Sequence, residues 1–465
     1  MQASPSPLLT DLYQLTMLRG YYRLGLHRRE TCFDLFFRRQ PFGGGYAVAA
    51  GLEDALSFVE QLCFAEEDLA YLATLDLFDD DFLRHLRDFR FAGDVWAVGE
   101  GEFVFPQEPL LRVHAALEEA QLIETALLNI VNFQTLIATK AARVCREAGR
   151  DNVIEFGLRR AQGPDGGMSA SRAAFIGGCA ATSNVEAGRC WDIPVRGTHA
   201  HSWVLAFPDE LAAFRAFAEV YPKNCTLLVD TFDTLRSGVP NAIRVGLEMK
   251  KRGERLAAIR LDSGDSAHLA REARRLLDKA GLTGVRILCS GDLDEYAIRE
   301  LKRRGAPIDL FGVGTRLVTA HDDPALSGVY KLAAMRDAAG EWSATMKLSD
   351  EDAKSTLPGV KQVWRRFDEA GMMAGDTIEL DAGDDSSGHF TSRISHSAFP
   401  LLQAAMKDGR ATAPWPPLAD LRARLKRNFE GLPESVARLH EPATYDVALG
   451  PRLREEIERL RKTDR

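Results

Sequence analysis

Short apolar runs rich in β-branched residues recur in the middle of this chain, and each precedes a polar or glycine-containing turn and then a helical segment. We predict strands at Val153–Phe156, Thr226–Val229, Ala257–Leu261, Val285–Cys289 and Ile308–Phe311. We predict helices between them at Asn241–Lys251, Ser266–Lys279 and Asp294–Arg304. The last four strands begin 31, 28 and 23 residues apart, as units with parallel strands require. Because strands that are apolar throughout need cover on both faces, the pattern predicts a parallel sheet or a closed βα barrel.

The segments on either side have a mixed α+β pattern. The elements that we predict there are Cys32–Phe37, helices across 51–90, strand-like Val95–Val113, Tyr330–Ala334, Glu341–Leu348 and the charged helix Pro451–Arg461. We therefore expect an irregular βα barrel domain at residues 131–329. We expect residues 1–130 to form an N-terminal α+β domain that residues 330–465 complete. The polar stretch from Gly375 to Gly388 is predicted to be a surface turn.

Charge and apolar patterning exclude several classes of protein. Lys and Arg number 59 against 67 Asp and Glu, a net charge of −8, which argues against a general basic surface for nucleic acid or membranes. Charged and polar residues interrupt the apolar stretch from Leu122 to Cys145, so an amphipathic or buried helix is predicted there rather than a membrane span. With no secretory signal pattern, the cytoplasm is the expected compartment. Seven scattered cysteines without a CxxC pair indicate reduced thiols rather than a zinc module.

Polar residues follow four of the predicted strands. These are the last four strands. Asp230 follows Thr226–Val229, and Arg260 and Asp262 lie in Ala257–Leu261 and the loop after it. Ser290-Gly291 follows Val285–Cys289, and Gly314-Thr315-Arg316 lies beyond Ile308–Phe311. In βα barrels the loops after the strands converge on one mouth. Gly314 and its neighbours alone indicate no more than a tight turn, but two adjacent loops of such donors favour a shared phosphate site.

Two further motifs have both a chemical and a structural interpretation. Phe156 and Arg159 lie at the end of a strand, where Phe156 could stack on a flat ring and Arg159 could bind a phosphate or carboxylate, although a core phenylalanine and a solvated arginine are common. His199 and His201 could be a metal pair, or a nucleophile or base, or structural histidines. The acidic loops would suit Mg²⁺. We assign no protein ligand to a metal.

Taken together, these motifs resemble the nicotinate phosphoribosyltransferase family over nearly the whole chain. The residues that carry the resemblance are Asp11–Met17, Phe42–Tyr46, Glu155–Gln162, Gly197–Ser202, Arg260–Asp265, Phe311–Leu317 and Lys354–Lys361. The resemblance implies an enzyme that forms nicotinate mononucleotide and pyrophosphate from nicotinate and 5-phosphoribosyl-1-pyrophosphate, with Mg²⁺ and with ATP hydrolysis driving the reaction. This is the entry step of NAD salvage from nicotinate. It also implies a homodimer with shared active sites.

The resemblance implies roles for individual residues. His201 would be phosphorylated by ATP, Asp230 would lie near the phosphohistidine and the metal, and Asp262 would accept hydrogen bonds from the ribose hydroxyls. The residues implied in substrate binding are Tyr13 of the partner subunit and Phe156 on the two faces of the pyridine ring, Arg260 beside that ring, and Arg159, Ser290, Gly291, Gly314, Thr315 and Arg316 at the 5′-phosphate.

Ring specificity separates this interpretation from its alternatives. Nicotinamide-using relatives have an acidic residue near the ring, whereas the corresponding residue here is the neutral Ser183, which does not repel a carboxylate. Ser183 therefore favours nicotinate as the substrate. The nearest alternative function is a nicotinamide phosphoribosyltransferase, and a quinolinate-using enzyme is the least favoured of the related functions. A silent nucleotide-binding protein would lack His201 or the phosphate loop, and a metal-dependent hydrolase would need further histidines.

Overall fold

The computed structural model describes residues 6–149, 152–337, 339–347, 355–381 and 398–463. The chain divides into two compact units. The first consists of residues 1–136 and 325–465, and the second consists of residues 137–324. The division falls inside the long helix α6 (Glu124–Ala148).

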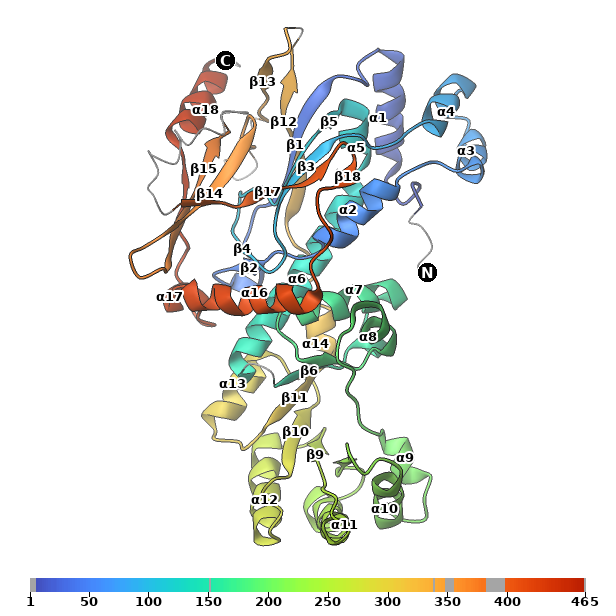
Figure 1. Ribbon diagram of the computed structural model, residues 1–465, viewed down its shortest axis with the longest axis vertical. Coiled ribbons are helices and arrows are strands. Elements are labelled where there is room, and N and C mark those ends of the chain that lie inside the picture. The colour runs from blue at the N-terminus through green and yellow to red at the C-terminus, as the bar shows by residue number, and fades with distance from the viewer. Residues whose placement is uncertain (1–5, 150–151, 338, 348–354, 382–397, 464–465) are drawn as a thin grey trace. The chain divides into compact units, whose positions relative to one another are not determined.

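The second unit is built on a six-stranded sheet (Figure 1). Its order is β7 (Ala181–Thr182), β6 (Val153–Glu155), β11 (Leu310–Val313), β10 (Arg286–Ser290), β9 (Ala258–Leu261) and β8 (Thr226–Leu228). All five strand pairs are parallel. The unit's helices are α7 (Gly163–Ile176), α8 (Val185–Trp191), α9 (His201–Leu205), α10 (Glu210–Val220), α11 (Val239–Lys251), α12 (Ser266–Lys279), α13 (Glu295–Arg303) and α14 (Thr315–Val318).

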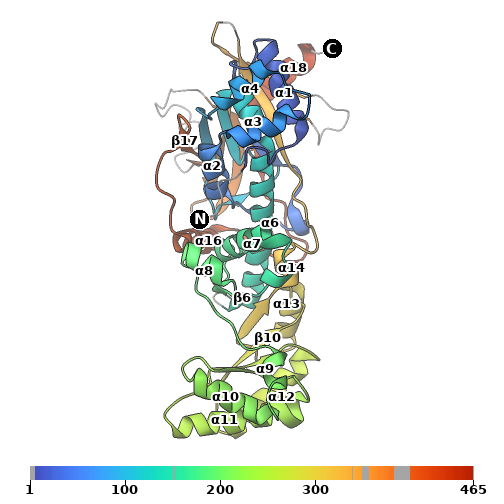
Figure 2. The ribbon, with the colours of Figure 1, turned by 90° about the vertical axis from the view of Figure 1, so that its right-hand side faces the viewer.

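Local sequence explains the boundaries of the outer helices of this unit. The Asp265 carboxylate accepts hydrogen bonds from two backbone N–H groups at the start of α12, and the Asp294 carboxylate accepts one, from Ala297, at the start of α13. A cap of this kind stabilises a helix by about 1 kcal/mol. Helices α10, α11 and α12 lie side by side (Figure 2), and their apolar faces pack with β8 and β9 into one core in which Leu227, Ile259 and Leu277 are fully buried.

The predicted irregular βα barrel is confirmed. Each of the five predicted strands exists, with ends that shift by no more than two residues, and α12 has the predicted bounds. Among the described residues no ladder joins β7 to β8, so the sheet is not closed into a regular barrel. An isolated bridge between Thr182 and Val195 extends its β7 side.

The first unit combines segments from both ends of the chain. Its seven-stranded sheet has the order β13 (Trp342–Ala344), β12 (Gly328–Arg336), β1 (Glu30–Phe37), β5 (Leu111–Ala116), β3 (Asp94–Val98), β17 (Leu402–Lys407) and β18 (Arg410–Ala411). All of its strand pairs are antiparallel. Strands that follow residue 327 thus pair with strands that precede residue 117, which confirms a mixed α+β domain built from both terminal parts.

Two smaller sheets and several helices complete the first unit. The strands are β16 (Ala398–Pro400), β14 (Lys361–Phe367), β15 (Met373–Leu380) and β19 (Val447–Leu449) in one sheet, and β2 (Ala47–Val48) and β4 (Phe103–Val104) in the other. The helices are α1 (Leu12–Arg23), α2 (Leu52–Gln61), α3 (Glu66–Ala73), α4 (Asp80–Arg87), α5 (Leu117–Leu122), α16 (Leu418–Gly431), α17 (Glu434–Ala437) and α18 (Pro451–Thr463).

Fully buried ion pairs join these segments. Lys361 of β14 lies 2.7 Å from the Asp34 carboxylate of β1, and both side chains are at most 2% exposed. Burial raises the pKa of Asp34, and the Lys361 charge opposes that rise. Arg365 donates to both carboxylate oxygens of Asp376, at 3.1 and 2.7 Å, across the β14–β15 pair. Such pairs fix one alignment of the strands, because either charge alone would be costly to bury.

One sequence-based prediction needs correction. The stretch from Gly375 to Gly388 is not a surface turn at its start, because residues up to Leu380 belong to β15 and five of the eight residues of that strand are buried. The acidic residues Asp376 and Glu379 gave this segment the composition of a turn, although both are buried in the strand. Residues 382–388 lie outside the described residues. Within the described part of the chain, none of the helices combines the length and the apolar character that crossing a membrane requires.

Candidate active site

Arg260 is the centre of the polar cluster in the second unit. It lies on β9, where its Nε donates to Ser290 Oγ at 2.8 Å and its Nη2 donates to Asp262 Oδ1 at 2.7 Å. Its Nη1 donates to Thr198 Oγ1 at 3.1 Å. These bonds use three of the five guanidinium N–H groups and leave two for a ligand. The guanidinium carbon is also 5.5 Å from the centroid of the Phe156 ring, within the range of a cation–π contact.

Two carboxylates connect the loops after β8 and β9. Asp230 Oδ2 accepts from the Asp262 backbone N–H at 2.9 Å and from Ser263 Oγ at 2.7 Å. Its other oxygen, Oδ1, is buried and has no hydrogen-bond partner in the described structure. Burial opposes ionisation of Asp262, but the hydrogen bond from Ser290 and the charge of Arg260 outweigh it and lower the pKa of this carboxyl. Asp262 is therefore a carboxylate at neutral pH.

The two histidines of the His-x-His motif have different environments. The ring of His199 is buried, its Nδ1 is 3.2 Å from the Ala200 carbonyl oxygen, and its Nε2 accepts from the Leu228 N–H at 3.1 Å. Both nitrogens are occupied, and burial lowers the pKa of His199. His201, at the start of α9, is 44% exposed, with Nδ1 3.1 Å from Thr231 Oγ1 and Nε2 4.0 Å from Asp262 Oδ2. His199 is thus structural, and His201 has a ring nitrogen available for chemistry.

The predicted phosphate loops lie on neighbouring strands. Ser290 ends β10, and Gly291 follows with a φ of +96°, where a Cβ would collide with the Asp262 carbonyl oxygen. Gly314, Thr315 and Arg316 follow β11, which pairs with β10. Arg316 Nη1 donates to Asp294 Oδ2 at 2.6 Å, and the Asp294 side chain is only 6% exposed. The arginine is therefore held in place while 37% of its side chain remains exposed.

Phe156 packs against a glycine of the adjacent strand. A Cβ on Gly312 would lie 2.5 Å from the Phe156 ring, so a side chain at Gly312 would displace it. Behind this strand end, the buried Glu155 accepts hydrogen bonds from the Gly157 N–H and from the hydroxyls of Ser171 and Thr182. Burial raises the pKa of Glu155, and these three donors oppose the rise.

The other predicted site residues are less closely connected to the cluster. Ser183 follows β7 and donates its backbone N–H to the Glu155 carbonyl at 2.9 Å, which attaches it to the same strand end. Arg159 is exposed on the short 3₁₀ helix Leu158–Arg160 and has no ion-pair partner among the described residues. Tyr13 belongs to the first unit, on α1, where it is 47% exposed.

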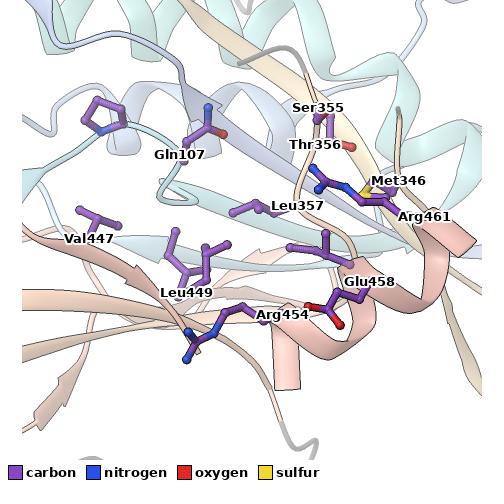
Figure 3. Close-up of a pocket in the computed structure, with 13 residues that line it drawn as sticks. Gln107, Met346, Ser355, Thr356, Leu357, Val447, Leu449, Arg454, Glu458 and Arg461 are labelled. Atoms are coloured by element: carbon purple, nitrogen blue, oxygen red, sulfur yellow. The ribbon is translucent and has the colours of Figure 1, made fainter. Parts of the chain in front are cut away.

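The motif Lys354–Lys361 contributes to a separate cavity in the first unit. Lys354 lies outside the described residues, but Thr356 and Leu357 help to line a cavity of about 570 Å³ (Figure 3). Its wall continues with Val447 and Leu449 of β19, and Figure 3 shows Arg454 and Arg461 of α18. None of the site residues of the second unit lines this cavity.

Sequence reasoning missed three residues that support the cluster. Glu155 lay inside a named motif, but only the structure shows that its carboxylate joins β6 to β7 and α7. Thr198 and Asp294, which hold Arg260 and Arg316, are distant from their partners in sequence. Asp294 could have been found as a helix cap, because an aspartate precedes the helical pattern.

The fold and this cluster together define a class of enzyme. Loops at the carboxyl ends of parallel strands gather two arginines, hydroxyls, two carboxylates and an exposed histidine around one region. In βα folds the ligand site lies at these strand ends. The arrangement is that of an enzyme that handles a phosphorylated, anionic substrate.

Comparison with known proteins identifies the family. Residues 8–132 match the nicotinate phosphoribosyltransferase N-terminal domain, and residues 360–456 match the C-terminal domain of the same family. The nicotinate phosphoribosyltransferase of Bacillus subtilis is 45% identical and covers 95% of this chain and 92% of its own. The human nicotinate phosphoribosyltransferase is 36% identical, and the match covers 97% of this chain and 96% of the human one. This chain belongs to the nicotinate phosphoribosyltransferase family.

Solved structures agree with this assignment. The crystal structure of human nicotinic acid phosphoribosyltransferase matches with a TM-score of 0.83 at 33% identity, covering 97% of this chain and 99% of that one. A nicotinate-nucleotide pyrophosphorylase from Pyrococcus furiosus has a TM-score of 0.72 at 22% identity, which shows the shared fold alone. The predicted family and activity are confirmed: the chain is an enzyme of NAD salvage that uses nicotinate.

Proposed function

We propose that this enzyme couples the formation of nicotinate mononucleotide to ATP through phosphorylation of His201. The observation that carries the proposal is the contrast within the His-x-His motif: both ring nitrogens of His199 are engaged, whereas His201 is 44% exposed. Thr231 Oγ1 contacts Nδ1 of His201, so Nε2, which faces Asp262 from 4.0 Å, is the nitrogen available to accept a phosphoryl group.

The remaining residues would bind and orient the substrates. Ser290, Gly291, Gly314, Thr315 and Arg316 offer donors on adjacent loops to the 5′-phosphate of phosphoribosyl pyrophosphate, and the exposed Arg159 is available to the same group. Asp262 would accept from the ribose hydroxyls, since it is ionised and keeps Oδ2 free of the Arg260 contact. Displacement at the anomeric carbon then depends on orientation and on charge stabilisation.

The acidic loops also fit a magnesium ion. Asp230 Oδ1 is buried and receives no hydrogen bond from the described residues, and a hard cation that prefers oxygen ligands would bind it there. When bound, Mg²⁺ neutralises charge on the pyrophosphate and makes it a better leaving group. The role of the chain itself is to hold Asp230 rigidly, through the Asp262 N–H and Ser263 Oγ.

Recognition of nicotinate would come from Phe156, Arg260 and Ser183. The Phe156 ring offers a stacking face, and Arg260 beside it has two uncommitted N–H groups that match a carboxylate. Ser183 carries no charge that would repel that carboxylate. Turnover of nicotinate in clear preference to nicotinamide is the expected result, and the reverse preference would overturn this assignment of Ser183.

The decisive experiment compares His201→Ala with the wild type, with nicotinate, phosphoribosyl pyrophosphate and Mg²⁺, in the presence and absence of ATP. We expect the variant to lose ATP stimulation and histidine phosphorylation while it retains slow ATP-independent turnover. His268→Ala, which removes an exposed histidine on α12, is the matched control and should behave like the wild type. ATP stimulation that persists in His201→Ala would exclude the proposed coupling.

We also propose a homodimer in which Tyr13 reaches the active site of the partner subunit. The support is the family resemblance together with the exposure of this large aromatic side chain, 47%. Tyr13→Ala and His201→Ala should each be impaired, but mixed dimers would contain one intact site. An equal mixture, refolded or coexpressed, should recover roughly a quarter of the wild-type activity if subunits pair at random. If Tyr13 served its own subunit, no recovery would occur.

The domain boundaries remain part of the proposal. We propose that residues 131–329 act as the phosphoribosyltransferase barrel and that residues 1–130, completed by 330–465, supply the second domain. The contact-defined units, residues 137–324 and the remainder, support this division.

A further inference from the structure

Two histidines and a glutamate meet in the first unit, and none of the three is a residue that the proposed reaction uses. His27 lies in the loop after α1, His85 lies on α4, and Glu118 lies on α5. One ligand atom of each lies within 4.8 Å of the other two. Among the described residues this is the group of at least three such side chains whose geometry suits a metal ion.

The spacing of the two histidine rings is compatible with a tetrahedral ion between them. Two imidazoles bound to one zinc at about 2.0–2.1 Å and at a tetrahedral angle have ring centroids roughly 5 Å apart. The centroids of His27 and His85 are 5.3 Å apart, with the rings inclined by 78°. Nε2 of His85 is 2.7 Å from Glu118 Oε2, a direct contact that a bound ion would widen to roughly 3.3 Å, the separation of two ligand atoms of a tetrahedral zinc.

One ring nitrogen in this cluster lacks a partner. Nδ1 of His27 is buried, and the described residues provide no hydrogen bond for it. Buried polar atoms are normally paired, so an exception indicates a missing partner. A cation bound between the three side chains would provide that partner.

The surrounding contacts hold the three side chains in position before any ion binds. The Glu118 backbone N–H donates to the His27 carbonyl at 3.2 Å, which holds the loop against the start of α5. Tyr22 stacks on the His85 ring at 4.4 Å and 23°, and its hydroxyl donates to Asp81 at 3.0 Å. Such outer contacts orient metal ligands and raise affinity.

We propose that His27, His85 and Glu118 bind one Zn²⁺ per chain, with water as the fourth ligand. Two imidazoles and a carboxylate form a donor set that zinc accepts, whereas Mg²⁺ and Ca²⁺ prefer oxygen ligands only. The site would fasten the end of α1 to α4 and α5. None of its three ligands has a role in the proposed reaction, and all three belong to the first unit.

The test is a zinc titration of the full-length protein after removal of metals with a chelator. Calorimetry and native mass spectrometry should show one tightly bound Zn²⁺ per chain. His27→Gln and Glu118→Gln should each lower the affinity at least tenfold, the size of effect that ligand-shell changes produce. The exposed-histidine variant His268→Gln should bind zinc like the wild type. Absence of stoichiometric binding, or equal binding by His27→Gln, would overturn the proposal.

Two further measurements separate this site from other causes. His201→Gln should retain the tight zinc, and its loss there would assign the ion to the second unit instead. Zinc should raise the melting temperature of the wild type but not that of His27→Gln, provided that circular dichroism shows the variant to be folded. Co²⁺ in place of Zn²⁺ should give the visible absorption of a four-coordinate site in the wild type, and the same spectrum in His85→Gln would contradict the assignment.

Discussion

The buried ion pairs of the β14 strand in the first unit differ in exposure from the Arg260–Asp262 pair at the site of the second unit. In the first unit, Lys361–Asp34 and Arg365–Asp376 are closed pairs whose side chains are at most 2% exposed. In the second unit, Arg260 and Asp262 pair just as closely, at 2.7 Å, yet are 16% and 28% exposed. Buried and fully paired charges specify the arrangement of strands, whereas charges with spare donors and access to solvent can bind a ligand.

The largest predicted effect is on the stability of the first unit. Arg365→Met would leave the Asp376 carboxylate, which is fully buried, without its cation. Breaking a buried pair from one side typically costs about 3–5 kcal/mol of unfolding free energy. Urea unfolding should show this loss, while kcat/KM of the protein that remains folded should stay near the wild-type value. A double variant that also removes Asp376 should recover part of the stability; if it is less stable still, the pair does not act as a unit.

The same substitution in the second unit should affect activity instead. Arg260→Met removes three hydrogen bonds and the charge beside Phe156, so kcat/KM for nicotinate should fall by roughly 10²–10³, the size of effect seen when one stabilising donor is lost. Because Asp262 keeps the hydrogen bond from Ser290 and 28% exposure, the unfolding free energy should change far less than in Arg365→Met. A comparable loss of stability in both variants would remove the distinction between the Arg365–Asp376 and Arg260–Asp262 pairs.

Glu155 is an intermediate case in this comparison. Its carboxyl group is buried, like the ion pairs of the first unit, but it supports the site of the second unit. Burial raises its folded-state pKa, so the stability it contributes is present below its unfolded pKa of about 4.3 and is lost as pH rises through the folded value. Glu155→Gln removes this titration. The difference in unfolding free energy, wild type minus variant, should therefore decrease between pH 4 and pH 8. Urea titrations at several pH values measure it, and a constant difference would mean that Glu155 does not titrate there.

The same contrast explains how much the sequence alone could predict. The strands of the second unit and the loops after them follow from local patterns, and those patterns are enough to assign Asp230, Arg260, Asp262 and Ser290 to one edge of the sheet. The supporting roles of Thr198 and Glu155 could not be predicted in this way, because their hydrogen bonds join segments that are far apart in sequence.

Long-range pairing also explains the failure in the first unit. Residues 375–380 contain Asp376 and Glu379, both fully buried, and so resemble a polar turn. They form a strand because Arg365 satisfies Asp376 and because the backbone N–H groups of Arg452 and Leu453 donate to Glu379. Acidic residues indicate an exposed segment only where no distant group can pair with them in the folded chain. The local sequence around residues 375–380 gives no sign of such a group.

The smallest predicted effect concerns Asp294, which caps α13 and also holds Arg316. Asn is as good a cap as Asp, so Asp294→Asn should change the unfolding free energy by less than about 0.5 kcal/mol. The ion pair to Arg316 is lost, however, and a less ordered guanidinium should raise KM for phosphoribosyl pyrophosphate by a factor of about 2–10 with kcat little changed. Asp265→Asn, the equivalent change at the cap of α12, is the control and should alter neither. A lower KM in Asp294→Asn would show that the carboxylate mainly neutralises Arg316, and that positioning contributes less than charge to phosphate binding.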